Sequence, residues 1–412
     1  MDTHEESPFK RPRFTSSEDE KASLLPKETS KKDDEDIGYR KFRGLNIETT
    51  WLHWLIGPVV FAYMFAMLCS FYVLVEYTNQ YFMKLEYKNA NLSLTNTSDT
   101  FCHADEDSIV YKTETRATAA ASTWNVYFSV AAGVPAVISN MVLGSYTDAF
   151  GRKFLMAIGV LGTMARLGTA ALVIYLDGEI VYILIACFIE GCTGQYATTL
   201  QVSLAYIADI TKPGRQRILG IIFIEFVIGV GLAIASFASG FLIEWKGYMF
   251  TFASMAGVLV VVLMVLIFIL PETLTKEHRH RNNSCLGLFK TSLSFFTEND
   301  AENRRWKYQL VLLIHALCNL SFLPRLSTET LYQLASPFCW SPTKVGIYSA
   351  ARTAVVLFVG LGSVNILEKF MDEIWICMIG TISYGASFFW TAFVSDDTQY
   401  YISKHYKQQT IF

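Results

Sequence analysis

Ionisable side chains inside long apolar stretches are the residues of this sequence best placed to do chemistry. Glu225 is the clearest, because it lies in GIIFIEFVIGVGLAIASFASG with at least two apolar residues on each side. A charge in hydrocarbon is costly, so a carboxyl group there favours its neutral form. We therefore predict that Glu225 takes up and releases a proton. The alternative is a glutamate held by a fixed hydrogen bond inside a helix bundle.

Other polar residues in apolar stretches are candidates for the same proton- or solute-binding role. Glu190, in FIEGCTGQ, is the second acidic candidate, and Gln195 could line the same cavity. His315 could titrate if it faced a cavity, although such a histidine is more often a hydrogen-bonded core residue. Arg325 and Arg352 could each bind an anionic group of a solute through paired donors.

The same residues exclude several classes of function. None of them has the spacing of a metal site or a nucleophilic triad, and the sequence contains no phosphate-binding P-loop. The formal net charge of −3 gives no reason to expect nucleic-acid binding through a basic surface. We expect a protein that is not an enzyme, with the proton as coupling ion and no metal or other cofactor.

Composition places these residues in a lipid bilayer. Hydrophobic residues make up 52% of the 412 residues and charged residues 17%, which is below the roughly 25% of a soluble domain. The sequence predicts an all-α polytopic membrane protein whose first span is a signal anchor, since residues 1–50 are polar and charged. A span needs about 20 apolar residues, and nine runs reach this length: 54–76, 122–143, 154–176, 180–207, 217–242, 248–270, 308–331, 344–366 and 373–394.

Lysine and arginine are concentrated in the amino-terminal segment and in alternate loops, which predicts that these parts are cytosolic. The longest basic loop follows the sixth run, as a linker between two bundles would. Only three runs follow it, so we interpret the chain as a truncated form. The predicted parts are a disordered cytosolic tail (1–50), an amino-terminal six-helix bundle (51–270), a cytosolic linker (271–307), a partial carboxy-terminal bundle of three helices (308–394) and a polar tail (395–412).

The segment between the second and third runs, GSYTDAFGRK, combines an acid with two bases at a predicted cytosolic edge of the membrane. Asp148 and Arg152 are four residues apart, so a helical turn would bring them within ion-pair reach. Lys153 follows directly. We expect these three residues to take part in gating.

A second charged segment, AYIADITKPGRQR, closes the fourth run on the same predicted side. Asp209 lies four residues before Pro213, and Arg215 and Arg217 follow the turn. We expect Asp209 to pair with one of these arginines, either as a gate or as a structural ion pair.

Two cysteines fall in predicted outer loops, where oxidation can occur. They are Cys102 and Cys339, and a disulfide between them would join the first outer loop to the loop after the seventh run. Two unpaired thiols are the alternative.

The amino-terminal tail contains Glu20 four residues before the Leu24-Leu25 pair. This spacing is that of an acidic dileucine sorting signal, which a clathrin adaptor would bind, although so short a string also arises by chance. We therefore expect either the plasma membrane or an endosomal or lysosomal membrane, and the dileucine-like string would direct the protein to the latter.

Several of these strings resemble a known family. GSYTDAFGRK is similar to the loop between helices 2 and 3 of major facilitator superfamily transporters, and AYIADITKPGRQR and LPETL also resemble that superfamily. LYQLASPFCWSPTKVGIYSA, at 331–350, looks like the solute carrier 46 family, which includes the proton-coupled folate transporter. The resemblance implies a disulfide between Cys102 and Cys339 and a proton-coupling carboxylate at Glu225.

The sequence also departs from that family. His315 lies about two turns too early to match the family's histidine in span 7, and Gln195 stands where the folate transporter has an aspartate. The arginine expected in span 10 has no counterpart, because no tenth run is present. Folate itself is therefore weakly supported as the solute.

These observations predict a secondary active transporter that carries protons together with an anionic organic solute by alternating access. Folate-like molecules, cyclic dinucleotides and lysosomal catabolites are the solutes that the resemblance suggests. The alternative is a truncated, non-transporting form that acts as a regulatory or binding membrane protein.

The predicted topology can be tested through its glycans. Asn91 and Asn96 lie in sequons of the first outer loop, so we expect both to be glycosylated. Asn282 is also in a sequon but lies in the predicted cytosolic linker, and we expect it to remain unmodified. Peptide mass spectrometry of the purified protein would map the occupied sites, and glycan on Asn282 would contradict the topology.

Overall fold

The computed structural model describes residues 51–90, 109–274, 305–334, 338–367, 370–371 and 373–391. Helices account for nearly all of these residues, and no strand occurs among them, which confirms the predicted all-α membrane fold. The backbone at Asp148, His315 and Arg325 is described, but their side chains are not. Predicted residues that lie outside the described ranges are Glu20, Leu24, Leu25, Asn91, Asn96 and Cys102.

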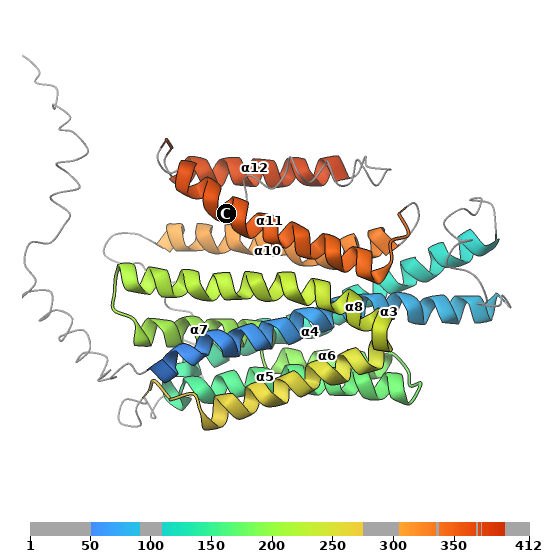
Figure 1. The fold of residues 1–412 in the computed structure, drawn as a ribbon, viewed down its shortest axis with the longest axis horizontal. Helices are drawn as coiled ribbons and strands as arrows, with labels where there is room; N and C mark the ends of the chain where they lie inside the picture. Colours follow the sequence, from blue (N-terminus) through green and yellow to red (C-terminus); the bar gives the residue numbers. More distant parts are fainter. Residues whose placement is uncertain are drawn as a thin grey trace, which may run out of the picture. The chain divides into compact units, whose positions relative to one another are not determined.

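The first group of helices runs from a short 3-10 turn, Trp51–Leu55, to residue 268 (Figure 1). Each apolar run in this part of the sequence overlaps one or two of its helices. These are α3 (Ile56–Asn89), α4 (Ile109–Phe150), α5 (Arg152–Tyr175), α6 (Val181–Cys192), α7 (Gln195–Ile210) and α8 (Arg215–Phe268).

A second group overlaps the last three apolar runs. It consists of α10 (Arg305–Leu334), α11 (Pro342–Leu367) and α12 (Glu373–Thr391). Among the described residues, α3, α4, α5 and α8 are long and apolar enough to cross a membrane on their own.

Helix α8 is bent at Gly247, which has φ 79° and ψ 179°, so its 54 residues form two successive helical stretches. A positive φ is accessible to glycine because it has no Cβ. The bend falls between the apolar runs predicted at 217–242 and 248–270. A single α8 therefore supplies both of these predicted spans.

The fourth apolar run, in contrast, is divided between α6 and α7. These helices have 12 and 16 residues, and the break between them lies at Thr193 and Gly194. At 1.5 Å per residue neither would cross the roughly 30 Å hydrocarbon core alone. We call the two helices together span 4. The sequence predicted a continuous helix here, and the break is a correction to it.

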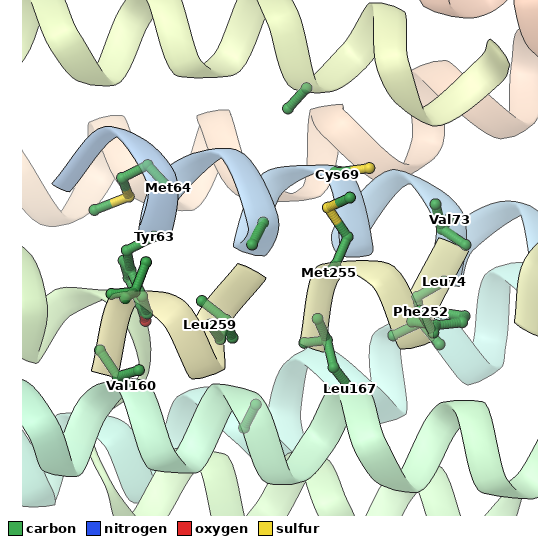
Figure 2. Packing of buried hydrophobic residues seen from close by; sticks show 14 of the residues in the cluster. Tyr63, Met64, Cys69, Val73, Leu74, Val160, Leu167, Phe252, Met255 and Leu259 are labelled. Carbon is green, nitrogen blue, oxygen red and sulfur yellow. The ribbon is translucent and has the colours of Figure 1, made fainter. Parts of the chain in front are cut away.

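The core of the first group lies where α3, α5 and the second stretch of α8 meet. Figure 2 shows Tyr63 of α3, Val160 and Leu167 of α5, and Met255 and Leu259 of α8 in this core. In a bilayer lipid is as apolar as these side chains, so close van der Waals packing is what holds such helices together. Both helices of span 4 also contact α5, so the position of α5 in this core determines where span 4 lies.

Candidate functional site

The start of helix α5 is capped by a carboxylate from the segment that follows α8. Gly151, with φ 101°, separates α4 from α5 and provides no side-chain cap. The backbone N–H groups of Arg152 and Lys153 donate to the two carboxylate oxygens of Glu272, with N–O distances of 2.9 and 3.2 Å. The first N–H groups of a helix have no partner within it, so an anion there is stabilised by hydrogen bonding and by the helix dipole.

An ion pair lies beside this cap. The Nε atom of Arg152 is 3.0 Å from Oδ2 of Asp209, and the two side chains are only 5% and 1% exposed. The hydroxyl of Thr273 donates to the same oxygen at 3.1 Å. We call Arg152, Asp209, Glu272 and Thr273 the latch, because they join α5, the end of α7 and the segment that follows α8.

The latch gives Asp209 a partner that the sequence did not predict. Asp209 pairs with Arg152 from the preceding helix connection, whereas Arg215 is exposed and Arg217 donates to the carbonyl oxygen of Ala208 at 3.0 Å. Gly151 lies between Asp148 and Arg152 and separates α4, which ends at Phe150, from α5. The side chain of Asp148 is not among those described, so its pairing with Arg152 stays a prediction.

A second buried ion pair lies deep in the first group. Nε of Arg166 is 2.6 Å from Oε2 of Glu190, with side chains 6% and 5% exposed. The guanidinium also donates to the hydroxyl of Ser70 on α3 at 2.9 Å. Arg166 is 14 residues into α5, about 21 Å along the helix and thus near the bilayer centre. Glu190, a predicted proton or solute residue, therefore has a fixed cationic partner that the sequence did not single out.

The break in span 4 is close to this pair. Gly194 has φ 82° and Gln195 has φ 55°, so two successive residues adopt the left-handed conformation. Asn140 of α4 donates to the carbonyl oxygen of Gly194 at 2.8 Å and accepts from the hydroxyl of Thr198 at 2.9 Å. Irregular backbone at membrane depth is tolerated when protein groups satisfy it in this way.

Glu225 lies in a different setting. Its side chain is exposed, and it makes no hydrogen bond or ion pair with the residues that the structure describes. Ser236 and Gly240 follow it by 11 and 15 residues, which places them about 20° and 60° from it around the helix. Glu225 thus shares a face of α8 with residues that pack against α11.

Helices α8 and α11 approach closely near the end of the first stretch of α8, on the side predicted to face outward. A Cβ added to Gly240 would lie 2.8 Å from the carbonyl carbon of Pro342, and one added to Gly346 would lie 2.5 Å from the carbonyl oxygen of Ser236. Glu244 completes the contact, because its carboxylate accepts from the backbone N–H of Thr343 in the first turn of α11 at 3.1 Å. We call this contact the seam; it joins the two groups of helices.

The second group contains a third ion pair. Arg352 of α11 lies 2.6 Å from Glu329 of α10, with side chains 18% and 11% exposed. Arg352, a predicted solute residue, thus has a carboxylate neighbour that sequence reasoning missed. His315 and Arg325 lie on α10, and their side chains are outside the described part.

Cys339 precedes an aromatic cluster at the start of α11. It is disulfide-bonded, whereas Cys69, Cys187 and Cys192 are free. The other cysteine of the bond is not among the described side chains, so the pairing with Cys102 stays a prediction. Trp340, which follows, is buried against Phe338 and Tyr348.

The helices and contacts described above can be compared with known proteins. Residues 108–403, more than half of the chain, match the Major Facilitator Superfamily. The chain belongs to this superfamily. It is therefore a multi-pass membrane transporter by family, and the prediction that it is not an enzyme is confirmed by the transporters it resembles.

Two superfamily relatives cover most of the chain. The lysosomal proton-coupled steroid conjugate and bile acid symporter SLC46A3 of Gallus gallus is 27% identical over 343 residues, which is 80% of this chain and 72% of the relative. The proton-coupled folate transporter of Bos taurus is 26% identical over 329 residues, 79% of this chain and 69% of the relative. The predicted resemblance to the solute carrier 46 family is confirmed.

Solved superfamily structures share the fold. The human organic anion transporter MFSD10 (TETRAN) aligns with a TM-score of 0.61 at 14% identity, covering 87% of this chain and 83% of that one. The inward-open xylose transporter XylE from E. coli aligns with a TM-score of 0.52, also at 14% identity, covering 87% and 81%. At this identity the likeness shows the fold alone.

The latch leads to a prediction about stability. Asp209→Asn removes the carboxylate that the Nε atom of the buried Arg152 contacts, and breaking a buried ion pair costs about 3–5 kcal/mol. The purified protein should melt at a clearly lower temperature than wild type. Arg215→Gln is the matched control, because Arg215 is exposed, and it should melt as wild type. A wild-type melting temperature for Asp209→Asn would show that the ion pair does not hold the latch.

The seam leads to a second prediction. Gly240→Ala places a methyl group against backbone atoms of α11 that cannot move aside, so it should force the seam open. A thiol introduced by Ser236→Cys, at a residue only 1% exposed, should then react faster with a membrane-impermeant maleimide. Gly257→Ala on the same helix is the control, since no atom of the described residues lies within 4 Å of its added Cβ. Equal labelling in the two alanine variants would contradict the seam.

Proposed function

We propose that this transporter couples the movement of an organic anion to protons, with Glu225 as the residue that carries the proton. The observation that carries the proposal is a carboxylate without a partner among the described residues, on the face of the membrane-spanning helix α8 that leads to the seam. Hydrocarbon does not accept an ionised carboxylate without a partner, so Glu225 must either lie beside water or be protonated.

This requirement links the proton to the conformational change. Glu225 is 10 residues into α8, about 15 Å along the helix, whereas Gly240 lies about 22 Å beyond it. The two groups of helices are packed at Gly240, and Glu225 is exposed. While Glu225 is ionised, closure of the helices over it would bury a lone charge. Once it is protonated, the helices can close over it and open at the other end, as alternating access requires.

The class of solute is inferred from the relatives. The names of SLC46A3 and of the folate transporter both specify proton coupling, and their solutes are steroid conjugates, bile acids and folates. We propose that the solute here is likewise an organic anion with a sizeable apolar body. A lysosomal membrane, the location that the name of SLC46A3 gives for that relative, would provide the acidic lumen that supplies the protons.

Reconstitution tests the proposal directly. The purified chain in liposomes should take up a taurine-conjugated bile acid, a sulfated steroid or folate faster when the outside is acidic than when both sides are neutral. Glu225→Gln cannot exchange a proton, so it should lose the acid stimulation while still binding the solute.

Glu179→Gln is the matched control, because Glu179 is an exposed carboxylate in the short connection between α5 and α6. Uptake by the Glu179→Gln variant should still be faster when the outside is acidic. Acid-stimulated uptake that survives in Glu225→Gln would remove Glu225 from the proton path. A folded wild-type protein that takes up none of the three probes would contradict the proposed solute class.

A further inference from the structure

The buried pair of Arg166 and Glu190 has no part in the proton path proposed above, yet it lies at the centre of the first group. Its two charges compensate one another at 2.6 Å, and Arg166 also binds Ser70. The pair thus fastens α6 to both α5 and α3. Tyr63 and Thr163, whose hydroxyl oxygens are 3.0 Å apart, lie on the same two helices and are also fully buried.

Glu190 is directly connected to the break in span 4. Its carbonyl oxygen accepts from the backbone N–H of Thr193 at 3.1 Å and from the hydroxyl of the same residue at 2.7 Å. Gly194 and Gln195 follow in the left-handed conformation. For Gln195, which has a Cβ, this conformation is strained, and such strain persists where the surroundings impose it.

The other half of span 4 is fastened to the same helix at a different point. Asp209, near the end of α7, pairs with Arg152 at the start of α5. The two arginines are 14 residues apart on α5, or about 21 Å. Helix α5 therefore holds α6 by one ion pair and α7 by another, with the strained residues between them.

A contribution to stability alone does not explain a buried ion pair. Desolvation of the two charges offsets most of their attraction, and replacement of both by apolar side chains of similar volume is often neutral or stabilising. An apolar contact does not fix how one helix is rotated relative to the other. The planar guanidinium, which contacts Glu190 and Ser70 at once, fixes the rotation of α6 as well as its distance from α5.

We propose that Arg166 and Glu190 are positioning residues for transport: they hold α6 on α5 and α3, so that span 4 turns at Gly194 and Gln195. When the latch pair of Arg152 and Asp209 opens, α7 then moves while α6 stays in place. This inference rests on the proposed alternating-access function, and the experiment that tests it does not require a solute.

The distance between the two ends of span 4 can be measured with spin labels on Glu179→Cys and Lys212→Cys, which flank α6 and α7 and are exposed. Other free cysteines are replaced, and the disulfide is retained. The variants are an apolar pair, Arg166→Met with Glu190→Leu, and an exchanged pair, Arg166→Glu with Glu190→Arg. Thr163→Val is the control, because it removes a hydroxyl in the same layer without affecting the ion pair.

We expect narrow distance distributions for wild type and for Thr163→Val, and a broader one for the exchanged pair, because its guanidinium starts from α6 and position 166 no longer donates to Ser70. The apolar pair should melt like wild type but give a broad distribution, and it should lose solute uptake in the reconstituted assay. A narrow distribution in the apolar pair would overturn the proposal, since the ion pair would then serve stability alone.

If the double variants do not fold, the same distance measurement on Arg166→Lys tests the proposal. It keeps the compensating charge but loses the planar group that contacts Glu190 and Ser70 together, so the distribution should broaden. A wild-type distribution in Arg166→Lys would contradict the proposal. Absence of uptake in wild type, with these distributions as expected, would reject the proposed solute and leave the positioning role standing.

Discussion

An ionised group on a membrane-spanning helix must find a counter-charge, remain beside water or become neutral, and this constraint assigns the acidic residues of this chain to different roles. Glu190 has Arg166 as its counter-charge, and Asp209 has Arg152. Glu225 has no partner among the described residues and lies exposed. Two of these three thus have a counter-charge on another helix, and we propose that the third responds to protons.

The sequence predicted the helices because an apolar run of about 20 residues has the length that a helix needs to cross a bilayer. It also singled out Glu225 as a candidate, since a lone carboxylate in such a run stands out, and its role stays a prediction. Arg166 carried the same signal in the third run, but its partner depends on which helices pack together. The partner of Asp209 was not predicted, because Arg152 comes from the start of α5, and only the packing of α5 against α7 brings the two residues together. The break in span 4 depends on Asn140, which lies in another helix.

The two groups of helices are joined by contacts of a different kind from those within each group. Inside the first group, side chains interlock in a continuous apolar core. At the seam, backbone meets backbone, because Gly240 and Gly346 have no side chains to separate it. Such a contact is close but has few rotamers to order, so it can separate and re-form at little entropic cost. This property suits a contact between two helix groups that would separate in each transport cycle, as we propose for the seam.

The cap on α5 has a mechanical consequence. Glu272 belongs to the last turn of chain before the segment that leads to the second group, and its carboxylate also accepts from the backbone N–H of Leu274. The chain therefore leaves the first group from a residue that is bound to the start of α5. A displacement of Glu272 would remove the cap of α5 and disturb Arg152 at the same time.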